Sequence, residues 1–207
     1  MERVYVESIT NEEVSQLPIG AFSGKIVVID RPEDVATACE QLRQNPLIGF
    51  DTETRPSFTK GHTNKVSLLQ LSGPDTAYLF RLNRVGFPET LRSLLSSRDH
   101  AKIGVGVYDD VRGLRSLHRF QPQNFIELQN VAPRYGITEK SLRKLAAIIL
   151  HFRISKAQRL SNWEAQQLTP AQQLYAATDA WVGREIYIEL SKVSPLVPAE
   201  NRLTSDL

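Results

Sequence analysis

Hydrophobic positions along the chain alternate between two spacings. Short apolar runs of about four to eight residues, rich in β-branched side chains, predict strands, whereas longer stretches with apolar residues roughly three or four apart predict helices. The predicted strands span 25–30, 47–53, 65–72, 76–80, 101–107 and 124–128. The predicted helices lie near 32–45, 88–97, 109–118, 140–150 and 170–192.

Strands and helices are interleaved, with no internal repeat or low-complexity linker. The short turn "GPD" (73–75) makes the strands on either side of it antiparallel neighbours. Thr169 followed by Pro170 marks the start of the last helix. The order predicts an α/β fold with a mixed sheet, mostly parallel apart from one antiparallel hairpin and flanked by helices on both faces.

Composition narrows the class of protein. With 207 residues, 41% of them hydrophobic and 23% charged, the chain is expected to form one globular domain that buries about 70% of its unfolded surface. A single cysteine, Cys39, can form neither an internal disulfide nor a thiolate metal site. The N-terminus is charged, and no apolar run reaches the roughly 18 residues of a membrane span. We therefore expect a cytoplasmic protein without a membrane segment.

Basic residues gather in one part of the chain, although the net charge is only +2. The segment 139–159 holds a single acid, Glu139, and six basic side chains: Lys140, Arg143, Lys144, Arg153, Lys156 and Arg159. Such a cluster can follow a phosphate backbone by releasing condensed counterions. It can equally form a solvated helix face, and the segment alone leaves both interpretations open.

Two carboxylates end the strand "LIGFDTE". Side chains two residues apart in a strand point to the same face, so Asp51 and Glu53 lie together. Each raises the pKa of the other unless a cation neutralises them, and oxygen ligands suit hard ions such as Mg²⁺ or Mn²⁺. The pair predicts a metal site, with solvent exposure of both acids as the alternative.

Two further segments repeat this arrangement. "KIGVGVYDDVRGL" (102–114) runs from a predicted strand into Asp109 and Asp110, where a carboxylate could also serve as a helix cap. Tyr175 and Asp179 are four residues apart and share one face of the last helix. Acids therefore follow or interrupt apolar elements at three separate places.

These motifs resemble those of a known family. Asp51-Thr52-Glu53, "VGVYDD" with Asp110, and Tyr175-x-x-x-Asp179 are similar to the three exonuclease motifs of the DEDD superfamily, in its tyrosine-containing subgroup. "KVSLLQLS" (65–72), "SNW" (161–163) and "LTPAQQLYAATDA" (168–180) resemble ribonuclease D and the exonuclease domain of the Werner helicase more than the proofreading exonucleases. The resemblance covers residues 25 to 190, nearly the whole chain.

The resemblance implies a ribonuclease H-like fold and hydrolysis of terminal phosphodiesters from the free 3′ end of DNA or RNA, releasing nucleoside 5′-monophosphates. Two Mg²⁺ or Mn²⁺ ions roughly 3.5–4 Å apart would activate water and stabilise the leaving oxygen. By the family pattern Asp51 bridges both ions, Glu53 and Asp179 hold the ion that activates water, and Asp110 contributes to the second. Tyr175 would orient the attacking water.

The resemblance also implies substrate contacts. The residues after the first acidic pair would lie near the 3′ end, and the loop before the catalytic helix would meet the backbone. Phe58 could stack on a base, and lysines could meet phosphate. The expected substrate-binding residues are Thr54, Phe58, Lys60, Lys65, Lys156 and Arg159.

Ribonuclease D carries helical binding domains after its catalytic domain, whereas this chain ends 28 residues after Asp179. We therefore expect one exonuclease domain over 1–207 without an accessory domain.

Two other functions remain open from the sequence. A non-catalytic nucleic-acid-binding or scaffold protein could keep the fold and lose the chemistry. A haloacid-dehalogenase-type phosphatase also places D-x-D-x-T after an apolar strand, although Glu53 replaces its second aspartate and Asp179 would have no role. The choice between DNA and RNA rests on contacts to the 2′-OH, which the sequence does not reveal.

Overall fold

The structure is a computed structural model that describes residues 4–57, 61 and 64–196. Within these ranges helices and strands alternate as the hydrophobic pattern predicts. The elements are α1 (Asn11–Gln16), β1 (Lys25–Ile29), α2 (Asp34–Leu42), β2 (Leu47–Thr54), β3 (Val66–Ser72), β4 (Thr76–Arg81), α3 (Leu82–Val85), α4 (Glu89–Leu95), β5 (Ala101–Gly104), α5 (Val107–Leu117), β6 (Phe125–Glu127), α6 (Leu128–Val131), the 3₁₀ helix η1 (Ala132–Tyr135), α7 (Leu142–Ile149) and α8 (Pro170–Ser191).

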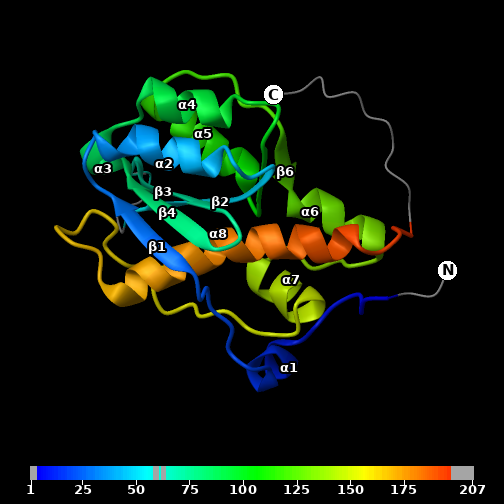
Figure 1. The fold of residues 1–207 in the computed structure, drawn as a ribbon. Helices are drawn as coiled ribbons and strands as arrows, with labels where there is room; N and C mark the ends of the chain where they lie inside the picture. Colours follow the sequence, from blue (N-terminus) through cyan, green and yellow to red (C-terminus); the bar gives the residue numbers. More distant parts are fainter. Residues whose placement is uncertain (1–3, 58–60, 62–63, 197–207) are drawn as a thin grey trace.

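The sheet lies at the centre of the fold. Its strands in the described part of the chain follow the order β1-β4-β3-β2-β5-β6. β3 runs antiparallel to both of its neighbours, whereas the other neighbouring strands pair in parallel. Helices α2, α4 and α5 cover one face, and α7 and α8 cover the other (Figure 1). The predicted α/β fold with a mostly parallel mixed sheet is therefore confirmed.

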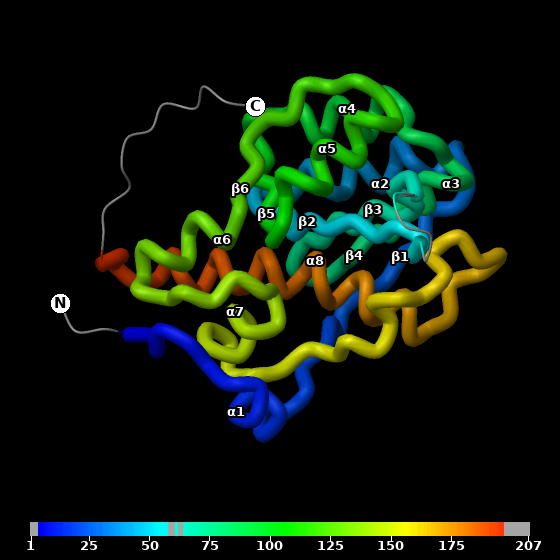
Figure 2. The backbone as a smooth tube through the Cα atoms, turned by 180° about the vertical axis from the view of Figure 1, so that it is seen from behind, coloured from blue at the N-terminus to red at the C-terminus, as the bar shows by residue number. Residues whose placement is uncertain are grey.

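The long helix α8 packs across the central strands, as seen from behind in Figure 2. It begins where the sequence predicted, because Thr169 and Gln172 form a capping box and Pro170 occupies the first turn. Gly49 of β2 permits the close approach of this helix, since a Cβ atom there would lie 1.9 Å from the carbonyl oxygen of Ala180. The contact fixes the separation between β2 and α8.

Gly49→Ala is expected to lower the free energy of unfolding by at least about 2 kcal/mol, because the added methyl group meets backbone that cannot move without shifting α8. Urea unfolding followed by circular dichroism measures this change. Gly73→Ala is the matched control, since its methyl group would meet only the Asn45 side chain at 3.1 Å. Equal stability of the two variants would show that the β2–α8 contact is not tight.

Two aspects of the predicted elements are wrong. The strand predicted over 101–107 ends at Gly104, because Gly106 adopts a left-handed conformation with φ +78° and α5 already begins at Val107. The short elements α1, α3, α6 and η1 were not predicted, since none is long enough to show a hydrophobic period.

No helix in the described ranges has both the length and the apolar character required to cross a membrane.

Candidate active site

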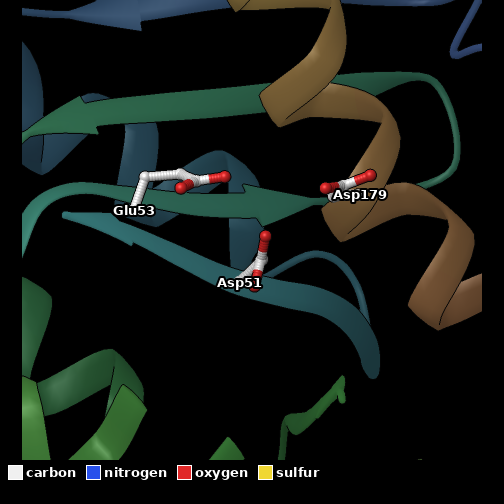
Figure 3. Close-up of side chains that lie close together, drawn as sticks. All are labelled: Asp51, Glu53 and Asp179. Carbon is white, nitrogen blue, oxygen red and sulfur yellow. The ribbon is translucent and has the colours of Figure 1, made fainter. Parts of the chain in front are cut away.

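Three of the predicted acidic residues converge at one place in the fold. Asp51 and Glu53 extend from β2, and Asp179 extends from α8 (Figure 3). One carboxylate oxygen from each residue lies within 4.8 Å of the other two. Residues 126 positions apart in the sequence therefore form one acidic cluster.

The short pairing between β2 and β5 leaves this cluster accessible. β5 pairs with β2 only over Leu47–Gly49, so the second half of β2 extends beyond its parallel neighbour. The space left open is a cavity of about 210 Å³. Its lining consists of Phe50, Asp51, Thr52, Glu53, Val105, Leu142, Tyr175 and Asp179. Acidic groups thus form part of a small cavity with apolar walls.

Burial and mutual repulsion make the carboxylates of the cluster hard to ionise. Burial raises the pKa of Asp51 well above its usual range, and the neighbouring acids Asp110, Asp179 and Glu53 raise it further. Burial and the charges of Asp179 and Asp110 raise the pKa of Glu53 to about 8. Burial raises the pKa of Asp179 to about 7. Such shifts favour either bound protons or a bound cation at neutral pH.

Tyr175 lies one turn before Asp179 on α8 and donates a hydrogen bond to its carboxylate. Its ring centroid is 6.0 Å from that of the buried Trp163, which fixes the position of the phenol. Burial, followed by the charges of Asp179 and Glu53, raises the pKa of Tyr175 above that of a free tyrosine. The hydroxyl group therefore stays protonated and can donate.

Asp110 lies beside the cluster rather than within the group of three. It accepts a hydrogen bond from the Thr52 hydroxyl at 2.5 Å, and its charge contributes to the raised pKa of Asp51 and Glu53. Burial raises the pKa of Asp110 itself to about 7, although the Thr52 bond opposes this shift. Asp109 differs, since its side chain is 80% exposed and pairs with Arg112.

Four of the six expected substrate-binding residues are described by the structure, and none of these four lines the cavity. Thr54 is exposed at the end of β2, and Lys65 is exposed just before β3. Lys156 and Arg159 are exposed on the loop before α8. Phe58 and Lys60 lie outside the described residues.

The basic segment 139–159 is only partly available to a ligand. Lys144 pairs with Glu139 at 2.7 Å, and Arg153 donates to the carbonyl of Leu17. Arg143 donates to Asn11. Lys140, Lys156 and Arg159 are exposed and form no ion pair with another described residue, so they remain the candidates for phosphate contact in this segment.

Two polar side chains that shape the site were not predicted from the sequence. Glu127 accepts a hydrogen bond from the backbone N–H of Val107 at 2.8 Å and so fixes the first turn of α5, which carries Asp110. Thr52 faces away from the cluster but holds Asp110 in place. The sequence offered one signal for Glu127, an acid at the end of a predicted strand. Its partner Val107 is 20 residues away in the sequence, so the hydrogen bond could not be predicted.

The donor atoms fit a hard divalent cation. Carboxylate oxygens are the ligands that Mg²⁺ and Mn²⁺ prefer. A bound cation would also stabilise the ionised forms of Asp51, Glu53 and Asp179, whose pKa values burial raises, and would offset the repulsion from other acids that adds to the shifts of Asp51 and Glu53. These three residues are therefore a candidate metal site.

Comparison with known proteins agrees with this geometry. A family model described as 3′-5′ exonuclease matches residues 26–194. Over 187 residues the chain is 33% identical to the bifunctional 3′-5′ exonuclease/ATP-dependent helicase WRN of Mus musculus, which covers 86% of this chain and 13% of that protein. The chain spans less than a third of the length of the first curated relatives it matches.

Solved structures share the fold. The exonuclease domain of Nibbler from Aedes aegypti superposes with a TM-score of 0.75 at 20% identity, covering 84% of this chain and 91% of that one. Ribonuclease D of Trypanosoma brucei, solved in complex with RNA U12, gives a TM-score of 0.70 at 19% identity. The match covers 87% of this chain and 65% of that one.

These matches decide between the families considered from the sequence. A haloacid-dehalogenase-type phosphatase is the wrong interpretation, because the family model that matches residues 26–194 is that of a 3′-5′ exonuclease. The resemblance to the DEDD superfamily is confirmed. The chain therefore belongs to the 3′-5′ exonuclease family.

Proposed function

We propose that this chain is a metal-dependent 3′-5′ exonuclease that removes nucleoside 5′-monophosphates from the 3′ end of DNA or RNA by a two-metal mechanism. The observation that carries the proposal is the convergence of Asp51, Glu53 and Asp179 beside Tyr175. Four partly buried carboxylates, counting Asp110, supply enough negative charge for two divalent cations.

Each residue has a distinct role in this proposal. Asp51, Glu53 and Asp179 would hold Mg²⁺ or Mn²⁺, and Asp110 would contribute from the other side of β2. Bound cations supply a water of lowered pKa and offset the charge on the leaving 3′ oxygen. Tyr175 would orient the attacking water by hydrogen bonding, because its raised pKa makes it a poor base at neutral pH.

A nucleic acid strand with a free 3′ end is the proposed substrate. One relative is described as an exonuclease and helicase, and a fold neighbour was solved with RNA. The exposed cations Lys65, Lys156 and Arg159 can meet backbone phosphates. Thr54 would lie near the terminal sugar, and Phe58 and Lys60 remain proposed contacts.

Incubation with 5′-labelled oligonucleotides tests the function. Single-stranded DNA, duplex DNA and RNA are compared in Mg²⁺ and in Mn²⁺, with EDTA as the control. A ladder that shortens from the 3′ end supports the proposal. Binding without shortening on all substrates would instead favour a non-catalytic scaffold.

Tyr175→Phe is expected to lower kcat on the order of tenfold, the effect of losing one hydrogen bond to the attacking water. Affinity for Mn²⁺, measured by calorimetry, should change by less than about twofold, since the phenol contributes no charge. Tyr187→Phe, three turns further along α8, is the matched control and should keep wild-type kcat. Loss of Mn²⁺ binding in Tyr175→Phe would indicate a purely structural tyrosine.

Asp110→Asn is expected to lower kcat at least about tenfold, because it removes a buried charge beside the cluster. Asp109→Asn should stay within about twofold of wild type, since its partner Arg112 is a surface residue. Single-turnover rates on a 5′-labelled strand compare the two variants. The reverse order of effects would assign the catalytic aspartate to position 109.

A further inference from the structure

A second groove shares lining residues with the acidic cavity. It has a volume of about 240 Å³, and its lining includes Ile19, Ala157, Ala171 and Leu174. Tyr175 and Asp179 line both this groove and the acidic cavity. The two spaces therefore adjoin at these two side chains.

Backbone contacts hold the walls of this groove in place. The segment before β1 pairs with the loop before α8, since Gly20 donates to the carbonyl of Arg153 and Arg153 donates to that of Pro18, both at 2.9 Å. The backbone N–H of Phe22 then donates to the Thr178 hydroxyl on α8 at 3.1 Å. The groove is thus formed before any ligand arrives, which lowers the cost of ordering it on binding.

The groove is apolar and exposed. Ile19 is 62% exposed and Leu174 is 39% exposed, which makes them two of the six exposed large hydrophobic residues in the described part of the chain. An exposed apolar patch beside a polar site commonly marks a ligand-binding surface. The volume is slightly below the roughly 300–1,000 Å³ of pockets for drug-sized ligands, so it suits a single planar ring.

Positive charge lies at the edge of the same groove. Lys156 and Arg159 flank the lining residues Ala157 and Gln158 in sequence, and both are exposed. Neither of these two side chains forms an ion pair with another described residue. An apolar groove with unpaired cations at its edge is complementary to a nucleotide, which carries a flat base and a charged phosphate.

We propose that this groove binds the base of the penultimate nucleotide, the one that remains on the strand after cleavage. The inference rests on the proposed exonuclease function, which places the scissile phosphate at the acidic cavity. The released nucleotide carries a single phosphate, whereas the retained strand continues with further phosphates. The groove, whose lining residues Ala157 and Gln158 are flanked by Lys156 and Arg159, therefore accepts the retained strand.

Filling the groove tests this assignment. Ala171→Trp places an indole ring at an exposed helical position in the groove, and Ala36→Trp places one at an exposed position of α2, on the other face of the sheet. Each variant degrades strands with a normal penultimate nucleotide and strands with an abasic one. The wild type should lose about tenfold in kcat/KM on the abasic strand, the size of one base contact.

The kcat/KM of Ala171→Trp on the normal strand should be about tenfold below that of the wild type, and the abasic strand should lower it no further. Ala36→Trp should behave as wild type on both. When the abasic residue is placed at the 3′ terminus instead, the kcat/KM of Ala171→Trp should still fall below that of the wild type by the same factor. Leu174→Ala, a milder change in the same groove, should show the same dependence on the penultimate base at smaller amplitude.

The outcomes separate the inference from the proposed function. Affinity for the same strands, measured by fluorescence anisotropy with Ca²⁺ in place of Mg²⁺, provides a readout that needs no cleavage. Affinity that depends on the penultimate base, without cleavage, would overturn the exonuclease proposal and keep the groove assignment. If the strand is cleaved but Ala171→Trp and the abasic penultimate residue lower kcat/KM independently of each other, the groove assignment alone is overturned. If Ala171→Trp changes the oligomeric state and shows no dependence on the penultimate base, the groove binds a protein instead. That result would also overturn the groove assignment.

Discussion

Replacing Asp51 or Asp179 by asparagine is expected to lower kcat at least about 10³-fold, because each change removes a charged ligand from the proposed cation site. Both side chains belong to the group whose oxygens lie within 4.8 Å of one another. Asparagine keeps the size of the side chain and removes its charge, so the loss reports on metal binding rather than on packing. Single-turnover cleavage of a 5′-labelled strand measures it.

The same variants should remain folded. In the metal-free protein burial raises the pKa of Asp51 and of Asp179, and the neighbouring acids raise that of Asp51 further. Removing one negative charge relieves repulsion, so Tm at pH 8 without metal should equal or exceed that of wild type. Near-normal cleavage in either variant would contradict the assignment, and so would unfolding of both.

Affinity for Mg²⁺ is expected to weaken at least about 100-fold from pH 8 to pH 6, because Glu53 and Asp179 are both mostly protonated at pH 6 and binding must displace these protons. Burial, with nearby charges, raises the pKa of Glu53 to about 8, and burial raises that of Asp179 to about 7. Calorimetry in two buffers of different ionisation enthalpy counts the released protons. An affinity that is independent of pH over this range would contradict the raised pKa values.

Stability of the metal-free protein provides a second readout with a defined sign. Since these pKa values are raised on folding, the native state binds more protons than the unfolded state between about pH 4 and pH 8. The contribution to the free energy of unfolding is therefore present below pH 4 and is lost as the pH rises to about 8. Mg²⁺ should restore it at pH 8.

A double variant isolates this contribution. Asp51→Asn combined with Asp179→Asn should remove most of the decline in Tm between pH 5 and pH 8 that the wild type shows without metal. Comparing the two proteins cancels groups outside the cluster, such as Lys102, whose pKa burial lowers to about 7. Identical pH profiles of Tm would show that the cluster does not titrate in this range.

Local sequence patterns predicted most of the sheet and the first part of the site. The alternation around Asp51 and Glu53 correctly placed both side chains on one face of β2, since the strand period is fixed by backbone geometry. The turn at 73–75 correctly predicted the antiparallel pairing of β3 and β4. Helical spacing also predicted that Tyr175 and Asp179 share a face of α8, and the two are hydrogen-bonded.

Contacts between distant segments explain what the sequence could not show. β5 gives way to α5 where the backbone N–H of Val107 donates to Glu127, a residue 20 positions further along the chain. The bond between Thr52 and Asp110 joins residues 58 positions apart. The groove beside Tyr175 depends on the pairing of residues 18–20 with 153, which no hydrophobic period encodes.

Anomalous diffraction from crystals of the protein soaked in Mn²⁺ tests directly whether the acidic cluster binds metal. We expect an anomalous peak within coordination distance of carboxylate oxygens from Asp51, Glu53 and Asp179, and its loss in Asp51→Asn. Manganese bound elsewhere, with no peak between β2 and α8, would contradict it.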